Sequence, residues 1–239
     1  MLNGSPDISV VILCYRAEDF VPVFVEQVES VLKKRGLIYE LILVANYFEH
    51  KPDYTPAFAS SVAKDKSHIR VVSQQKNGMM GWDMRTGLGA ANTESKTIAV
   101  IDGDGQMPPE DIVRIYDHML SGNYDMVKTY RVKRYDPKSR LFISKIFNIV
   151  LKILFPSVCV QDINGKPKIF RIEALHKLRL TSSRWFIDAE IVIQATKNKF
   201  RIGEIPTVFY ANKHRPSFVT LKAIFHFVVD MMWYRLKTL

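Results

Sequence analysis

The chain has 239 residues, of which 47% are hydrophobic, and this composition suits one globular domain with its own core and excludes a disordered chain. Its 34 lysines and arginines exceed its 24 aspartates and glutamates, which gives a net charge of +10. Such an excess favours a polyanionic partner, namely nucleic acid, an anionic membrane or a phosphorylated ligand.

The cysteines and the apolar segments narrow the cellular setting. Cys14 and Cys159 have no metal-ligand spacing around them, so a reducing compartment fits best. Residues 1–7 contain no basic region followed by an apolar stretch, so we expect no secretory signal. No apolar run reaches the roughly 20 residues that a membrane span needs. We therefore expect a cytoplasmic protein that touches a membrane without crossing it.

Strand-like and helix-like patterns alternate through the first 130 residues. In chain order, strands are expected at 8–13, 39–44, 69–73, 97–101 and 126–130, with helices between them at 20–34, 56–65, 82–91 and 110–121. The first run, ISVVIL, is typical of parallel strands that are buried on both faces. This alternation predicts an α/β fold with a Rossmann-like, doubly wound and mostly parallel sheet.

The second half of the chain is less regular. We expect an amphipathic helix or a pair of helices over 137–160, and a loop over 162–170 that leads into a short strand. A helix over 187–197, a strand over 201–209 and a terminal helix over 219–236 complete the pattern. No linker or repeat divides the chain, so residues 1–239 are expected to form a single domain.

The segment IDGDGQMPPE places Asp102 and Asp104 directly after an apolar strand. Ligands of doubly wound sheets bind beyond the carboxyl ends of the strands, where the loops 14–19, 45–50 and 102–106 would meet. Two carboxylates so close together favour a hard cation, Mg²⁺ or Mn²⁺, with Gln106 as a neutral oxygen ligand. The alternative is an ordinary turn at a strand end, since Asp-Gly pairs are common in turns.

This segment also carries a family resemblance. DGDGQMPPE is similar to the D-x-D-x-Q-x-x-P-E signature of the family 2 glycosyltransferases of the GT-A fold. The chain most resembles their dolichol-phosphate mannose synthase and polyprenyl-phosphate group. The resemblance implies a nucleotide-sugar-binding half at about 8–130 and an acceptor and membrane-facing half at about 131–239. It implies that Asp104 and Gln106 bind the metal, with Asp102 on the metal or on the ribose.

Four segments are similar to the parts of the family that bind the nucleotide sugar. VILCYRAED at 11–19 matches its first loop, with Leu13 in place of a proline, and Asn46 stands where the family has acids. Asn46 leaves the identity of the base open. NGMMGWDMRTGLGAA at 77–91 resembles a glycine-rich segment, and KHR at 213–215 would hold the leaving diphosphate. The implied nucleotide-sugar-binding residues are Leu13, Tyr15, Glu18, Asn46, Gly78, Gly81, Arg85, Asp102, Gly103, Asp104 and Arg215.

DINGKPKIFR at 162–171 is similar to the acceptor-side segment of the family, D-x-x-S-G-F-R-L-Y-R. Lys166 and Pro167 replace its Gly-Phe, and Lys168 takes the place of its inner arginine. Two cations on one face of an extended segment could hold a phosphate. The implied acceptor-phosphate residues are Lys166, Lys168 and Arg171, and the implied catalytic residues are Asp102, Asp104, Asp162, Asp188 and Lys168.

The chemistry of the acceptor decides what Asp188, in the segment WFIDAE, would do. A sugar hydroxyl needs a general base to remove its proton, and Asp188 is the candidate. A lipid phosphate is already anionic and needs none. We expect an inverting transfer from a nucleoside-diphosphate sugar to a polyprenyl phosphate. A sugar hydroxyl of a surface glycan or lipopolysaccharide is the alternative acceptor.

Two other classes of function remain to be weighed. A non-catalytic nucleotide-binding protein is compatible with the altered first loop and with the missing acids after the second strand. Nucleic acid is not the expected partner, because the aromatic residues are not interleaved with the basic stretches.

The segment 137–156 combines basic and apolar residues. Its basic residues Lys138, Arg140, Lys145 and Lys152 lie among apolar ones, which indicates peripheral contact with an anionic membrane surface.

Overall fold

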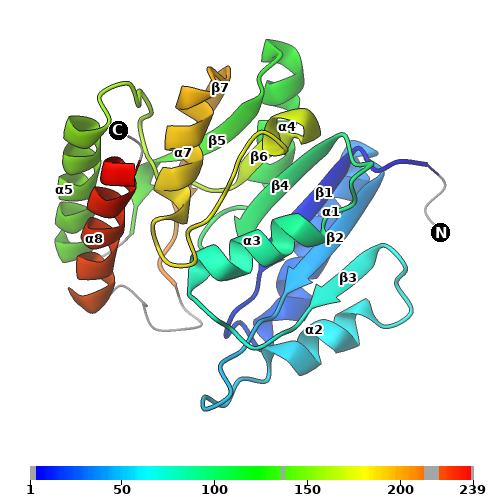
Figure 1. Cartoon of the computed structure of the whole chain (residues 1–239). Helices are drawn as coiled ribbons and strands as arrows, with labels where there is room; N and C mark the ends of the chain where they lie inside the picture. The colour runs from blue at the N-terminus through cyan, green and yellow to red at the C-terminus, as the bar shows by residue number, and fades with distance from the viewer. Residues whose placement is uncertain (1–3, 136–137, 213–220, 238–239) are drawn as a thin grey trace.

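The computed structural model describes residues 4–135, 138–212 and 221–237. In this part of the chain a sheet of seven strands runs in the order β3-β2-β1-β4-β6-β5-β7, and helices cover both of its faces (Figure 1). The strands are β1 (Ile8–Leu13), β2 (Tyr39–Val44), β3 (Ile69–Val72), β4 (Thr97–Asp102), β5 (Met126–Arg134), β6 (Lys168–Arg171) and β7 (Ile202–Phe209). The helices are α1 (Phe20–Arg35), α2 (Thr55–Ala63), α3 (Met80–Ala90), α4 (Glu110–Gly122), α5 (Lys138–Leu154), α6 (Ile172–Leu175), α7 (Ile187–Lys197) and α8 (Leu221–Lys237).

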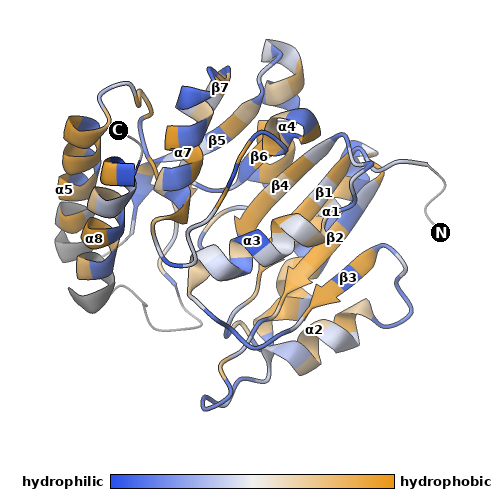
Figure 2. Ribbon diagram, in the orientation of Figure 1, coloured by the Kyte–Doolittle hydropathy of each residue, from blue (hydrophilic) through white to orange (hydrophobic). Residues whose placement is uncertain are grey.

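Two apolar cores hold the helices to the sheet. Val10 and Ile12 of β1 face one core with α1, α2 and α4, whereas Val11 and Leu13 face the other with α3 and α7. Side chains alternate between the faces of a strand, so a strand that is covered on both faces has to be apolar throughout. Figure 2 shows this as the predominantly hydrophobic colour of β1, β2 and β4.

The predicted α/β sheet is confirmed, with one addition. β6 runs antiparallel to both of its neighbours, β4 and β5, and the other paired strands are parallel. Because β6 runs the opposite way, its first residue lies at the same edge of the sheet as the last residues of β4. The residues that precede β6 therefore reach the edge at which a doubly wound sheet binds its ligands.

The helices α5 and α8 pack against each other beside the sheet (Figure 1). The rings of Phe147 on α5 and Phe227 on α8 have centroids 4.7 Å apart, and Phe186, just before α7, contacts Phe227 at 5.7 Å. The segment 137–160 thus contains one long helix. Within the described ranges, no helix combines the length and the apolar character that crossing a bilayer would require.

Candidate active site

The loop after β4 carries the acidic segment. Asp104 and Gln106 are 7% and 6% exposed, and the Gln106 amide N–H donates to Asp104 Oδ1 over 3.1 Å. Gly105 adopts φ +69°, and a Cβ at this position would lie 2.8 Å from the ring of Phe20. Only glycine fits both conditions without strain, so the second glycine of DGDG fixes the shape of the loop.

The same loop is tied to the end of β7. Gln106 Nε2 donates to the carbonyl of Tyr210 over 2.9 Å, and the Tyr210 amide donates to the Gln106 carbonyl over 2.8 Å. A side-chain amide that donates through its nitrogen keeps its oxygen as an acceptor. Gln106 Oε1 is therefore available as a ligand.

These donors fit a hard divalent cation. Asp102, Asp104 and Gln106 offer carboxylate and amide oxygens, the ligand types that Mg²⁺ and Mn²⁺ prefer. No cluster of three His, Cys, Asp or Glu residues that could hold a metal occurs among the described residues. Mg²⁺ sites often combine one or two carboxylates with substrate phosphates, and Asp102, Asp104 and Gln106 would suit such a site.

Two lysines from the segment before and within β6 reach the acids. Lys166 Nζ lies 3.1 Å from Asp102 Oδ2 and 3.3 Å from Asp188 Oδ2, while Lys168 Nζ lies 2.6 Å from Asp188 Oδ1. Lys166, Lys168 and Asp188 are 3%, 0% and 1% exposed. Asp102 and Asp188, which lie 64 and 22 residues from Lys166 along the chain, thus form one ionic cluster with it.

The charges of this cluster shift one another's protonation. Burial alone would raise the pKa of Asp188, but Lys166 and then Lys168 outweigh it and lower that pKa below its usual range. Burial lowers the pKa of Lys168 to about 8, although Asp188 opposes the change. Burial also raises the pKa of Asp102, opposed by Lys166 and reinforced by Asp104. Asp188 is thus held as a carboxylate that accepts a proton poorly.

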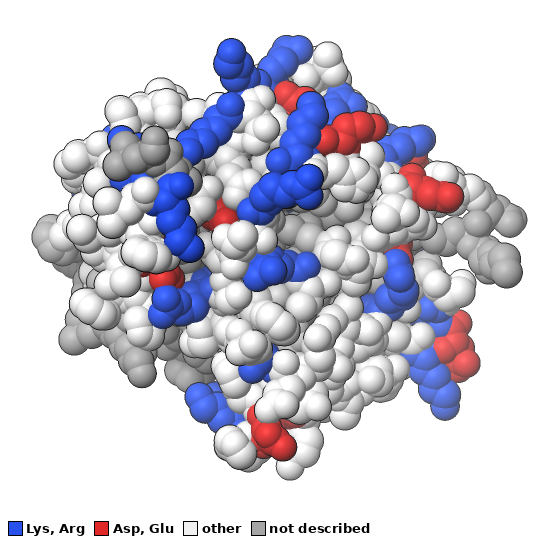
Figure 3. All heavy atoms as spheres, in the orientation of Figure 1, with Lys and Arg blue, Asp and Glu red and all other residues white. Residues whose placement is uncertain are grey.

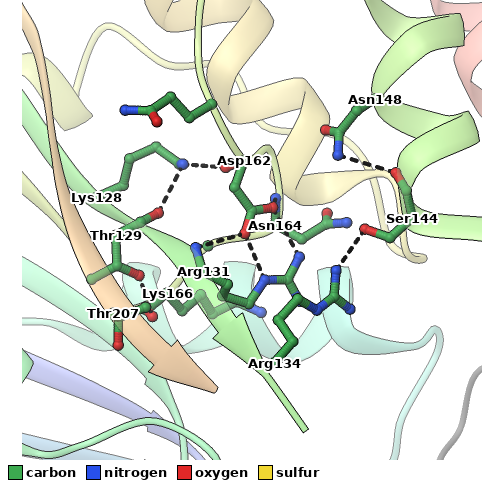
Figure 4. Close-up of polar contacts among 12 residues, drawn as sticks. Lys128, Thr129, Arg131, Arg134, Ser144, Asn148, Asp162, Asn164, Lys166 and Thr207 are labelled. Atoms are coloured by element: carbon green, nitrogen blue, oxygen red, sulfur yellow. Dashed lines mark hydrogen bonds and ion pairs between the residues drawn. The ribbon is translucent and has the colours of Figure 1, made fainter. Parts of the chain in front are cut away.

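A second ionic cluster is centred on Lys128 and Arg131, which lie within β5 (Figure 4). Arg131 donates to both carboxylate oxygens of Asp162, over 2.6 and 2.8 Å. Burial alone would raise the pKa of Asp162, but the hydrogen bonds and charge of Arg131 lower it instead. Lys128 donates to the carbonyls of Thr129 and Asp162 and pairs with Glu204 at 3.1 Å.

Arg131 and Lys128 were not among the predicted site residues. Asp162 lies 31 residues from Arg131 and 34 from Lys128, and nothing in the sequence pairs them. Lys128 lies within β5, where its burial could not be read from the pattern MVKTY. The extension of β5 beyond Tyr130 to Arg134 is what brings Arg131 to the site.

Aromatic and polar side chains meet where β1, β2 and β3 end. The rings of Tyr15 and Phe48 are 5.9 Å apart and perpendicular, and Lys76 Nζ lies 4.0 Å from the Tyr15 ring centroid. Lys76 pairs with Asp83 of α3, and Asp83 accepts a hydrogen bond from Asn46. The sequence predicted Tyr15 here but missed Phe48, Lys76 and Asp83.

Asn46 is held entirely inside the protein, contrary to its expected contact with the nucleotide. It is 0% exposed; its Nδ2 donates to Asp83 and Thr86, and its Oδ1 accepts the amide of Gln74. Since these partners take both donors and the oxygen, Asn46 orients Asp83 and the loop before Lys76. We therefore no longer count Asn46 among the residues expected to contact the nucleotide.

Leu13 and Gly103 join the ends of β1 and β4, whereas Glu18 contacts the start of α2. The Gly103 amide donates to the Leu13 carbonyl over 2.9 Å, which joins the ends of the two strands. Leu13 is 5% exposed, so only its backbone is placed to contact a nucleotide sugar, as the sequence predicted for this residue. The Glu18 amide donates to Thr55 Oγ1 over 3.0 Å, in a residue with φ +43°.

Gly78 and Gly81 face protein where a nucleotide was expected. A Cβ at Gly78 would lie 2.6 Å from the Ser183 carbonyl oxygen, and one at Gly81 would lie 2.5 Å from that of Ser182. The amide of Gly81 already donates to the Arg184 carbonyl over 2.9 Å. These glycines allow α3 to begin against the segment before α7, and that packing accounts for them.

Two predicted cations, Arg85 and Arg171, lie away from the acidic cluster. Arg85 donates to the Thr181 carbonyl and to Ser183 Oγ, so it binds the segment before α7. Arg171 pairs in register with Thr97, at the opposite end of β4 from Asp102, and donates to Asn123 and the Tyr124 carbonyl. Arg171 is too far along the strand to share a phosphate with Lys168. Arg215 lies outside the described residues.

The positive charge is not confined to the buried site. Figure 3 shows Lys and Arg side chains spread over the face that carries α3 and α7. Arg85 and Arg179 line a groove of about 360 Å³ beside Ile98, at the opposite end of β4 from Asp102.

Comparison with solved structures assigns this fold to the GT-A glycosyltransferases. Glucosyl-3-phosphoglycerate synthase from Mycobacterium tuberculosis, in complex with Mn²⁺, uridine diphosphate and phosphoglyceric acid, has a TM-score of 0.74 and 18% identity, over 96% of this chain and 78% of that one. The same enzyme with Mg²⁺ and uridine diphosphate has a TM-score of 0.72 and 16% identity, over 96% and 79%. The predicted GT-A fold is confirmed.

The chain belongs to glycosyl transferase family 2, whose sequence profile matches residues 9–187. The undecaprenyl-phosphate 4-deoxy-4-formamido-L-arabinose transferase of Pectobacterium atrosepticum is 29% identical over 153 residues, which cover 64% of this chain and 45% of the relative. The dodecaprenyl-phosphate galacturonate synthase of Rhizobium johnstonii is 26% identical over 233 residues, which cover 95% and 66%. The chain spans about half to two thirds of the length of these relatives.

Proposed function

We propose that this chain transfers a sugar from a nucleoside-diphosphate sugar to a polyprenyl phosphate, with Mg²⁺ or Mn²⁺ and with inversion at the anomeric carbon. Membership of family 2 and the prenyl-phosphate chemistry in the names of two relatives support the general reaction. The observation that carries the choice of acceptor is the pairing of Asp188 with two buried lysines.

The donor would lie along the ends of β1, β2 and β4. Tyr15 and Phe48 offer aromatic faces at the ends of β1 and β2, on the side where a base would bind, and Asp102 lies at the end of β4. Asp104 and Gln106 would hold the metal together with the diphosphate. When bound, the metal would neutralise the negative charge that grows on the leaving diphosphate.

The acceptor would enter from the β5 side. Arg131 and Lys168 place cations around Asp162 and Asp188, and guanidinium and ammonium groups bind phosphate well. An acceptor phosphate would exchange contacts with these carboxylates and attack the anomeric carbon from the face opposite the diphosphate. The new bond joins phosphate oxygen to carbon as the bond from carbon to the diphosphate breaks, and no proton has to move.

The second candidate acceptor, a sugar hydroxyl, would need a general base. Asp188 is the acid of the cluster that could act as this base, but Lys166 and Lys168 lower its pKa, and a carboxylate so stabilised removes a proton poorly. An acceptor that is already anionic needs no base and can itself pair with these lysines. This difference favours the phosphate.

A membrane contact through α5 and α8 would bring a lipid-linked acceptor to the site, at the cytoplasmic face in our proposal. Ile149 and Ile153 of α5 are 52% and 72% exposed, and Phe225 and Trp233 of α8 are 66% and 59% exposed. Lys152 lies on the same helix as the two isoleucines. Apolar side chains flanked by lysines suit the interface of an anionic bilayer.

Sedimentation with anionic vesicles tests this membrane contact. Ile153→Glu should reduce the fraction of protein that sediments with the vesicles, and an unchanged fraction would remove this surface from the proposal.

An acceptor panel tests the proposal directly. The purified chain with Mn²⁺ and a set of UDP- and GDP-sugars is offered a polyprenyl phosphate, the matching polyprenol and a free saccharide. Transfer to the phosphate alone is the expected result. Transfer to the saccharide would favour the second candidate, and donor binding without any transfer would indicate a non-catalytic nucleotide-binding protein.

A further inference from the structure

Lys166 stands where the acceptor-side segment that this chain resembles has a glycine. Its side chain is 3% exposed, and its ammonium group lies against Asp102, the first acid of the metal-binding segment. The sequence suggested that Lys166 and Lys168 would act together on the acceptor. In the structure Lys166 contacts both Asp102 and Asp188, whereas Lys168 contacts Asp188 and the Gly165 carbonyl but not Asp102.

The backbone around Lys166 is firmly held. Thr129 Oγ1 donates to the Lys166 carbonyl, and the Thr129 amide donates to the Pro167 carbonyl over 3.2 Å. A Cβ at Gly165 would lie 1.8 Å from the Thr129 carbonyl oxygen, so the segment approaches β5 as closely as a glycine permits. Lys166 is therefore presented to Asp102 from a fixed position.

The side chain is held as well. Its ammonium group pairs with Asp102 on one side and with Asp188 on the other, at 3.1 and 3.3 Å. Moving away from Asp102 would leave the Lys166 ammonium group, whose side chain is 4% exposed, without this partner, and an unpaired buried charge is costly. Lys166 thus remains at the metal end of the site unless something else replaces it.

A fixed ammonium group beside Asp102 places a positive charge next to the oxygens that would bind a divalent cation. Asp102 Oδ2 is already paired, and the ion would be placed within a few ångströms of a like charge. Asp104 and Gln106 alone are a weak oxygen set for Mg²⁺ or Mn²⁺. A donor diphosphate supplies further oxygens and at least two negative charges, which would offset the ammonium group.

We propose that Lys166 is a positioning residue whose ammonium group shares Asp102 with the divalent ion, so that the ion binds together with the donor diphosphate and only weakly before it. This inference rests on the proposed metal-dependent donor site and assigns Lys166 a role distinct from acceptor binding. Lys166 acts on the reaction through Asp102.

Binding of Mn²⁺ to the purified chain, followed by electron paramagnetic resonance, tests the inference without any turnover. Lys166→Met should bind Mn²⁺ alone about tenfold or more tightly than the unaltered chain, since a nearby like charge is removed. With UDP present, the difference between the two proteins should shrink. Lys168→Met is the matched control, because it removes an equal charge that pairs with Asp188 and not with Asp102. It should tighten Mn²⁺ binding less.

Equal Mn²⁺ affinity in Lys166→Met and the unaltered chain would overturn the inference, as would equal tightening by both methionine variants. A purely structural role for Lys166 would lower thermal stability without tightening Mn²⁺ binding. Lys166→Arg keeps the charge and should keep the weak affinity, which covers the case in which Lys166→Met does not fold. Failure of Mn²⁺ to bind the unaltered chain even with nucleotides would count against the proposed function itself, whereas an unaltered Lys166→Met affinity would not.

Discussion

The two halves of the sheet handle charge in opposite ways. In the strands β1, β2 and β4 the residues within the sheet are largely apolar, and the acids Asp102 and Asp104 come at or after a strand end. In the pair β5 and β6, by contrast, Lys128 and Lys168 are register partners inside the sheet, both 0% exposed. In the first half the buried charge within these strands is Glu40, which pairs with Arg70 of β3, whereas the second half carries lysines inside the sheet.

The two halves also differ in how their charged side chains are paired with other residues of the chain. The buried cations of the second half are matched by carboxylates of the same chain: Lys128 by Glu204, Arg131 by Asp162 and Lys168 by Asp188. At the tip of β4, Asp102 is paired with Lys166. We expect the β4 side to bind a cation together with its substrate, and the β5 side to exchange anions.

The largest expected effect comes from the close contact between β5 and the segment before β6, inside the second half. Gly165→Ala would place a methyl group 1.8 Å from the Thr129 carbonyl oxygen, so the segment would have to move away from β5. We expect a loss of unfolding free energy on the order of 4 kcal/mol, measured by urea denaturation. Gly89→Ala, in α3 with no atom within 4 Å, is the control and should stabilise by roughly 0.5 kcal/mol. Equal effects of the two variants would refute this view of the contact.

Removing one buried lysine should have the next largest effect. Lys168→Met leaves Asp188 with only Lys166, and breaking a buried ion pair typically costs about 3 kcal/mol. Lys96→Met breaks an exposed pair with Asp7 and should change urea stability little. If the two variants unfold at the same urea concentration, the buried charges of the second half do not stabilise it as described.

A smaller effect should appear in the first half as pH falls. Burial alone would raise the pKa of Glu29, but hydrogen bonds from Lys66, His68 and Tyr39 lower it from 4.5 to about 2. Its carboxylate therefore stabilises the fold above pH 4.5, and this contribution is lost as pH falls from 4.5 toward 2. We expect a loss of about 2 kcal/mol over this range, and a flatter profile for Glu29→Gln. Parallel profiles for the two proteins would contradict the assignment.

The same contrast explains what the sequence could predict. The helix expected at 187–197 matches α7, because its apolar residues repeat at helical spacing. The strands of the first half were predicted within about two residues, since continuous apolar runs identify strands that are covered on both faces. The family signature led directly to Asp102, Asp104 and Gln106, which the structure places in one loop.

The second half resisted prediction because buried charges carry no local signal. The antiparallel direction of β6 cannot be read from the four residues KIFR. The pairing of Arg131 with Asp162 joins segments 31 residues apart, and either residue alone would be expected on the surface. Gly78 and Gly81 were predicted to contact the nucleotide. In the structure their lack of a side chain is explained by the backbone of Ser182 and Ser183, which packs directly against them.

The central claim is that the oxygens at the tip of β4 hold a divalent ion together with a donor diphosphate. Calorimetric titration of UDP into the chain, with and without Mn²⁺, tests it most directly. We predict that Mn²⁺ tightens UDP binding by about tenfold or more, and that Asp104→Asn abolishes most of this gain. Identical UDP affinity with and without Mn²⁺, or a gain that persists in Asp104→Asn, would contradict the account.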